Sequence, residues 1–247
     1  MPALNLHKDL AETDWRTTAE HPKLITGAVH VWRVPLRVSS GRPAALAALL
    51  SPEETARCAR FRFAADRAAF VAARGRLREL AAAYLGQKPA EVRFAYATHG
   101  KPFLPGSDLQ FNVSHAGDWA VMAFTRKTEI GVDTERIDRN FRVEDLVERF
   151  FSRVEIPVIL EQADRHRAFF LAWTRKEAVI KARGDGLRLP LHQFGVTTEA
   201  EAAVRLLHTD WAPEEFRRWQ LHSFTVAEGY PGAVAWLGPA QQLCFLE

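Results

Sequence analysis

Two long helical segments, predicted at residues 66–86 and 165–187, resemble each other and recur in a repeated order of elements. That order is strand, helix and strands, then helix and strands again. The matches keep one fixed offset: Phe70 with Phe170, Ala72 with Ala172, and Gly86 with Gly186. A repeated order of this kind indicates two related halves. We therefore expect an α+β fold of two pseudo-symmetric αβ halves, with an active site at the seam between them.

The 247 residues are enough for one large domain or two small ones. We divide them into a polar lead-in at 1–26, an N-terminal half at 27–127 and a C-terminal half at 128–247. Strands are expected at 28–36, within 92–104 and 109–137, and as a hairpin at 217–238; further helices are expected at 51–61 and 143–151. The first of these helices has Ser51 as its N-cap and Pro52 in its first turn, which is a typical helix start.

Composition excludes several classes of protein. Hydrophobic residues make up 47% and charged residues 26% of the chain, as is typical of a soluble globular protein. Two cysteines, Cys58 and Cys244, make neither a disulfide framework nor a zinc site on their own. The first residues include acids and no apolar core, and no run approaches about 20 apolar residues, so we expect no signal peptide, no membrane span and a cytoplasmic location. The net charge of +3 suits an anionic ligand or an acidic partner without choosing between them.

The stretch "GVDTER" at 131–136 places two carboxylates, Asp133 and Glu135, at the end of an apolar strand. Side chains two apart on a strand point to the same side, so both carboxylates can reach one ion. Hard cations such as Mg²⁺ favour oxygen ligands of this kind. The alternative is a strand end that simply runs into a polar turn.

The stretch "WTRKEAVIK" at 173–181 places Trp173, Glu177 and Lys181 on one face of a helix. A solvated Glu–Lys pair is the simplest interpretation, but Phe169 and Phe170 set this face near the core. If Glu177 meets Asp133 and Glu135, the three carboxylates must share protons or a cation.

Three further groups supply candidate phosphate contacts. "FNVSH" offers Asn112, Ser114 and His115 at one strand end, although Asn and Ser also bond their own backbone in turns. "GKP" holds Lys101 beside the rigid Pro102. Arginines crowd the first helical region at Arg57, Arg60, Arg62 and Arg67, where they form either a solvated face or a set that neutralises several phosphates.

"FNVSH", "GVDTE" and "WTRKEAVIKARGDGL", in this order and at these separations, resemble the 4′-phosphopantetheinyl transferases of the surfactin-synthetase-activating type. The likeness extends to "GKP", "SPEETARCARF", "ARGRLR" and "LPLHQF", and covers roughly residues 28–238. The resemblance implies an α+β fold of two pseudo-symmetric halves, in agreement with the repeat.

The resemblance also implies an activity. Such enzymes move the phosphopantetheine arm of coenzyme A to a serine of an acyl or peptidyl carrier protein and release 3′,5′-ADP. By similarity, Asp133, Glu135 and Glu177 hold Mg²⁺, with Mn²⁺ as a substitute, and Lys181 contacts the phosphates and assists the leaving group. Ser114 and His115 match contacts to the 3′-phosphate and adenosine. Arg57, Lys101, Pro102 and Asn112 complete the coenzyme A set.

Glu155, in "RFFSRVE", matches a glutamate proposed as the base for the carrier serine; metal-bound water or another carboxylate is the alternative. Two positions depart from relatives: Glu54 stands where some have a basic residue, and Phe70 where some have a hydroxyl. The rival hypotheses are a metal-dependent nuclease and a non-catalytic module that binds coenzyme A or a carrier protein. We expect a monomer that binds neither nucleic acid nor a membrane.

Overall fold

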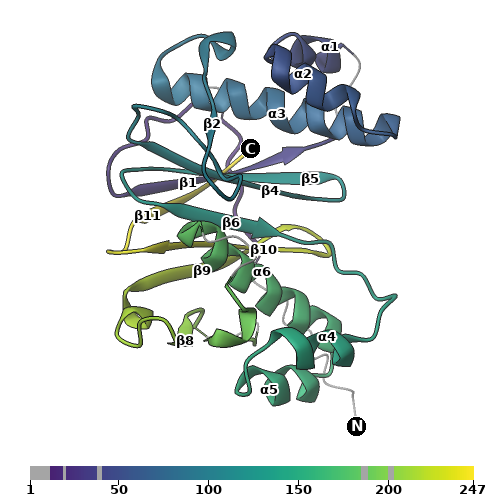
Figure 1. The fold of residues 1–247 in the computed structure, drawn as a ribbon, viewed down its shortest axis with the longest axis vertical. Helices are drawn as coiled ribbons and strands as arrows, with labels where there is room; N and C mark the ends of the chain where they lie inside the picture. Colours follow the sequence, from purple (N-terminus) through teal and green to yellow (C-terminus); the bar gives the residue numbers. More distant parts are fainter. Residues whose placement is uncertain (1–11, 19–20, 38–40, 185–188, 200–202) are drawn as a thin grey trace.

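The computed structural model describes residues 12–18, 21–37, 41–184, 189–199 and 203–247, which form two sheets between two layers of helices (Figure 1). The first sheet has the order β11-β1-β5-β4, with β1 at Ala28–Pro35, β4 at Leu109–Ala116, β5 at Trp119–Arg126 and β11 at Gln242–Leu246. The second has the order β6-β10-β9, with β6 at Ile130–Thr134, β9 at Trp219–Ala227 and β10 at Tyr230–Leu237.

The two halves repeat one topology. In each, a first strand pairs with the last strand of a hairpin, which gives the orders β1-β5-β4 and β6-β10-β9. Each half also has a small antiparallel pair, β2 (Ala95–Tyr96) with β3 (Pro102–Phe103) and β7 (Phe194–Val196) with β8 (Leu206–Thr209). The expected α+β fold is therefore confirmed. The last strand, β11, pairs in parallel with β1, so the end of the chain returns to the sheet of the N-terminal half.

Helices cover the outer face of each sheet (Figure 1). Above the first sheet lie α1 (Arg42–Ala47), α2 (Pro52–Ala59) and α3 (Ala64–Leu85); below the second lie α4 (Val143–Phe150), α5 (Glu155–Glu161) and α6 (Arg165–Arg183). Short 3₁₀ turns occur at Pro89–Glu91, Leu191–Gln193 and Glu215–Arg218. Among the described residues, no helix is both long and apolar enough to cross a membrane.

The helix ends follow the expected chemistry. Ser51 caps α2 in a capping box with Glu54. Gly86 ends α3 and Gly184 ends α6, both in the left-handed conformation that glycine adopts most readily. The structural partner of Gly86 is thus Gly184, so the fixed offset does not extend to the helix ends; Gly186 lies outside the described residues.

Side chains between the two sheets form an apolar core. Val29 and Val31 of β1 belong to the same buried cluster as Val132 of β6 and Trp236 of β10. Residues of the lead-in close one side of this core, since Trp15 packs edge-on against Phe224 and Phe245, which lie on β9 and β11.

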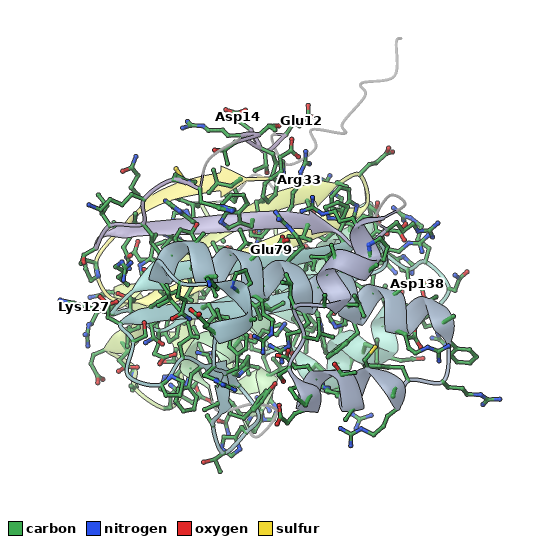
Figure 2. All side chains as sticks on the ribbon, turned by 90° about the horizontal axis from the view of Figure 1, so that it is seen from above. Glu12, Asp14, Arg33, Glu79, Lys127 and Asp138 are labelled. Atoms are coloured by element: carbon green, nitrogen blue, oxygen red, sulfur yellow. The ribbon has the colours of Figure 1, made fainter. Side chains whose placement is uncertain are left out.

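The lead-in also gathers charge on this side of the molecule. Arg33 of β1 lies 5.0 Å from the centre of the Trp15 ring and pairs with Glu247. Figure 2 shows Arg33 close to Glu12 and Asp14 on one face. This face is therefore polar, although the cluster beneath it is apolar.

Strand β6 lies directly against α6, and Gly131 makes this approach possible. A Cβ atom built on Gly131 would stand 2.0 Å from the Ala178 carbonyl oxygen and 2.3 Å from the Ala182 nitrogen. Both are backbone atoms of α6, which cannot move aside as a flexible side chain can. Glycine at 131 therefore sets the distance between the strand that carries Asp133 and the helix that carries Glu177.

We predict that Gly131→Ala lowers the free energy of unfolding by about 3 kcal/mol, because the added methyl group must separate β6 from α6. Gly86→Ala is the comparison: its left-handed backbone has open space around it, so the loss there is about 1 kcal/mol. Denaturant unfolding of both variants measures the difference. A loss at Gly131 no larger than that at Gly86 would contradict the role of this contact.

Candidate functional site

One serine and two charged side chains, from three different elements, meet at the seam between the halves. Asp133 Oδ1 accepts hydrogen bonds from Lys181 Nζ at 2.6 Å and from Ser114 Oγ at 2.7 Å. Lys181 Nζ also donates to Ser114 Oγ at 2.9 Å. The three residues come from β6, α6 and β4, so this cluster joins both sheets to the helix.

Glu135 and Glu177 complete the cluster, as their electrostatics show. The pKa of Glu135 is raised from 4.5 to about 7, first by burial and then by the charges of Asp133 and Glu177, against the opposing effects of Lys181 and a hydrogen bond from Trp173. Burial and Asp133 likewise raise the pKa of Glu177. The three carboxylates therefore lie close enough for their charges to interact, although only Asp133 contacts the Lys181 ammonium group, and the cluster has an excess of acidic groups.

The donor set fits a hard divalent cation. Burial raises the pKa of Asp133 despite its two hydrogen bonds, and its second oxygen, Oδ2, is buried with no hydrogen-bond partner among the described residues. Carboxylate oxygens are the ligands that Mg²⁺ prefers. In the present geometry Lys181 supplies the positive charge, and no three acidic, histidine or cysteine side chains of the described chain converge as metal ligands do. The oxygen ligands and negative charge of this cluster fit a divalent cation, which Asp133, Glu135 and Glu177 would hold.

A separate cavity of about 650 Å³ lies in the N-terminal half. Three of the residues expected to contact coenzyme A line it, namely Arg57, Pro102 and His115. Phe61, Phe70 and Tyr96 add aromatic walls. An opening that combines cationic and aromatic groups suits a ligand with phosphates and a flat ring system.

The alternation of side chains along β4 separates residues that the sequence grouped together. Val113 and His115 face the cavity, whereas Asn112 and Ser114 face β6. Asn112 Oδ1 accepts a hydrogen bond from the Val132 nitrogen at 3.0 Å and so ties the two sheets together. Neither Asn112 nor Ser114 lines the cavity, because neighbouring residues on a strand point to opposite faces.

The ammonium group of Lys101 contacts residues outside the cavity. Its Nζ atom lies 2.6 Å from Glu129 Oε2 and donates to the Ala182 carbonyl oxygen at 3.4 Å. The side chain thus connects the loop between β2 and β3 to the end of α6, across the seam. The structure places Lys101 beside the carboxylate cluster's helix rather than beside His115.

The structure does not bring Glu155 to the carboxylate cluster. Its side chain is buried in the core of the C-terminal half and is ion-paired with Lys176 at 2.8 Å. Glu54, the other unusual acid, is also buried; besides capping α2 it pairs with Arg74 and Arg78. Both acids have structural partners, and burial of this kind cannot be read from a single sequence.

Two models of known families match the chain, one in each half. The model described as "4'-phosphopantetheinyl transferase, N-terminal" matches residues 39–127, and that of the "4'-phosphopantetheinyl transferase superfamily" matches residues 129–235. The chain belongs to the 4′-phosphopantetheinyl transferase superfamily. The family expected from the motifs is thereby confirmed, and the matches support neither rival hypothesis.

Relatives agree with this membership. The chain is 38% identical over 179 residues to the 4′-phosphopantetheinyl transferase HetI of Nostoc sp., which covers 70% of this chain and 76% of the relative. It is 33% identical over 172 residues to a 4′-phosphopantetheinyl transferase of Bacillus subtilis, covering 68% and 75%. It is 29% identical over 188 residues to the 4′-phosphopantetheinyl transferase Sfp of that species, covering 75% and 81%.

A solved structure, that of the holo-[acyl-carrier-protein] synthase of Thermotoga maritima, matches a smaller part. The identity is 22% and the TM-score 0.35, over 44% of this chain and 62% of the other.

We predict that Glu135→Gln stabilises the metal-free protein at pH 8 and has little effect near pH 5. The pKa of Glu135 is raised to about 7 in the folded state, from 4.5. Above pH 7 the carboxylate is charged in both states and destabilises the fold; toward pH 4.5 it is protonated when folded and increasingly protonated when unfolded, so the destabilisation disappears.

Thermal unfolding in excess chelator at both pH values measures this effect. Glu161→Gln, at an exposed position on α5, is the matched control and should change neither melting temperature. An equal shift at both pH values for Glu135→Gln would show that the crowding of charge is not the cause.

Proposed function

We propose that this chain transfers the 4′-phosphopantetheine arm of coenzyme A to a serine of an apo acyl or peptidyl carrier protein, with Mg²⁺, and releases 3′,5′-ADP. Family membership supports the reaction class. The observation that carries the proposal for this chain is the meeting of Asp133, Glu135, Glu177 and Lys181 at the seam. We also propose that the protein is a monomer, that it is cytoplasmic, and that its two halves meet between residues 127 and 128.

The chain's own residues account for binding at both ends of coenzyme A. His115 and Arg57 at the cavity are suited to the 3′-phosphate, and the aromatic walls to the adenine ring. Asp133, Glu135 and Glu177 would hold the cation, which when bound supplies positive charge to the pyrophosphate oxygens. Ser114 and Asn112 orient Asp133 and β6, so their part is support rather than contact with the ligand.

In the transfer itself, the carrier serine oxygen forms a bond to the phosphorus of the pantetheine phosphate. The phosphoanhydride bond to 3′,5′-ADP breaks, and the serine proton passes to a base. Lys181 is placed to stabilise the negative charge that develops on the departing phosphate, because its ammonium group already lies in the cluster. Lys101 lies at the same seam, where its ammonium group contacts the end of α6 and is ion-paired with Glu129.

The central test is mass spectrometry of an apo carrier protein incubated with the enzyme, coenzyme A and Mg²⁺. We predict the gain of one phosphopantetheine group, and a rate at least about 100-fold lower for Asp133→Ala, since even residues that only support metal ligands often change activity by 10–100-fold. Glu161→Ala removes an exposed carboxylate and should retain the wild-type rate. Undiminished transfer in excess chelator would exclude the metal, and no transfer to any carrier would exclude the function.

A second prediction concerns the coenzyme A cavity. His115→Ala should raise KM for coenzyme A about tenfold, the effect of losing a hydrogen bond to a charged group. It should raise KM for dephospho-coenzyme A much less, because that ligand lacks the 3′-phosphate. His192→Ala, an exposed histidine in the other half, is the control. Equal losses with both ligands would assign His115 to the fold.

A further inference from the structure

The ion pair between Glu155 and Lys176 is fully buried. Both side chains have a relative exposure of 0%, and their charged atoms lie 2.8 Å apart. Lys176 belongs to α6 and immediately precedes Glu177. A buried ion pair is no guarantee of stability, since desolvation offsets much of the attraction. Its presence beside a cluster residue therefore calls for another explanation.

Both oxygens of Glu155 and the ammonium group of Lys176 have hydrogen-bond partners within the core. Glu155 Oε2 accepts from the Ser152 nitrogen at 2.8 Å, from Ser152 Oγ at 2.6 Å and from Lys176, and Oε1 accepts from the Val196 nitrogen at 2.8 Å. Lys176 Nζ donates to the carbonyl oxygens of Leu191 and Phe194. A base must offer a free lone pair to its substrate, and Glu155 has no exposed oxygen to offer a serine on another protein.

The network has a consequence for the orientation of α6. Successive residues of a helix point about 100° apart, so a fixed direction for Lys176 also fixes the direction of Glu177. Lys176 attaches α6 to the start of α5 and to β7, while the Gly131 contact sets α6 against β6. Two separate attachments thus determine how α6 is rotated and how close it lies to Asp133.

We propose that Glu155 and Lys176 are positioning residues, whose ion pair holds α6 in the rotation that brings Glu177 to Asp133 and Glu135. This inference rests on the proposed function in one respect, namely that the carboxylate cluster binds a divalent cation. It replaces the role of general base that the sequence suggested for Glu155.

The test compares Glu155→Gln, Lys176→Gln and the double variant E155Q/K176Q. Each single change leaves one buried charge without its partner, whereas the double variant removes both charges and keeps amide groups to bond Ser152 and the two carbonyl oxygens. Binding of Mn²⁺ alone, followed by electron paramagnetic resonance, reports the geometry of the cluster without any turnover. The matched control is Arg165→Gln, which also changes α6 but breaks only an exposed ion pair with Glu144 of α4.

If the pair positions α6, each single variant binds Mn²⁺ about tenfold more weakly, as loss of a supporting partner does elsewhere. The double variant recovers wild-type affinity to within about threefold, and kcat recovers with it. The acidic limb of the pH–rate profile stays in all variants, because no base has been removed. Arg165→Gln binds Mn²⁺ as the wild type does.

Three results would overturn the proposal. If Glu155→Gln binds Mn²⁺ normally, loses kcat and its acidic limb, and gains nothing from Lys176→Gln, then Glu155 is the base after all. If all variants match the wild type, the pair has no influence on the cluster. Should Glu155→Gln fail to fold, Ser152→Ala loosens the same carboxylate more mildly and should weaken Mn²⁺ binding; wild-type affinity in that variant would also count against the proposal. A wild-type protein that binds no Mn²⁺ would instead refute the proposed function.

Discussion

The backbone contact between β6 and α6 at Gly131 is the constraint on which the cluster depends. A side chain at this position would meet backbone atoms of α6 at 2.0 Å, so the strand and the helix can lie this close only because residue 131 is glycine. Two residues along β6, Asp133 then reaches Lys181, which sits on α6 just beyond Ala178. The glycine and the aspartate of the "GVD" motif thus have linked roles: Gly131 lets α6 lie close to β6, and Asp133 therefore reaches Lys181 on that helix.

This proximity comes with an electrostatic penalty. Burial raises the pKa values of Asp133, Glu135 and Glu177, and repulsion from neighbouring carboxylates raises those of Glu135 and Glu177 as well. Without a cation, the folded protein therefore holds charge that the unfolded chain would expose to water. Lys181 offsets one charge of the three. A fold that keeps such an arrangement sacrifices stability at a functional site, where local rules of packing and polarity are most often broken.

Local patterns in the sequence predict the parts of this structure that depend on neighbouring residues. The capped start of α2, the extent of α3 and α6, and the strand positions of Asp133 and Glu135 all follow from capping, periodicity and glycine placement. The alternation along β4 also carries enough information to separate Ser114 from His115, although the motif treated them as one group. The parallel pairing of β11 with β1 and the burial of Glu155 depend on contacts across more than 40 residues or on the three-dimensional core, so no local pattern indicates them.

The two halves share one topology but differ in the charge of the side chains that they bring to the seam. In the N-terminal half, the cavity is lined by the basic side chains Arg57, Arg74 and His115 and by one acid, Asp66, so basic groups outnumber acidic ones there, although Arg74 is ion-paired with Glu54. In the C-terminal half, helix α6 directs Glu177 toward two more carboxylates, so acidic side chains outnumber basic ones on that side. A ligand with a phosphate at one end and a pyrophosphate further along would suit both sides at once: arginine and histidine would bind the first group, and a cation held by Asp133, Glu135 and Glu177 would supply positive charge to the second. A symmetric fold therefore suits an asymmetric ligand because the two halves, alike in backbone, differ in the sign of the charge they bring to the seam.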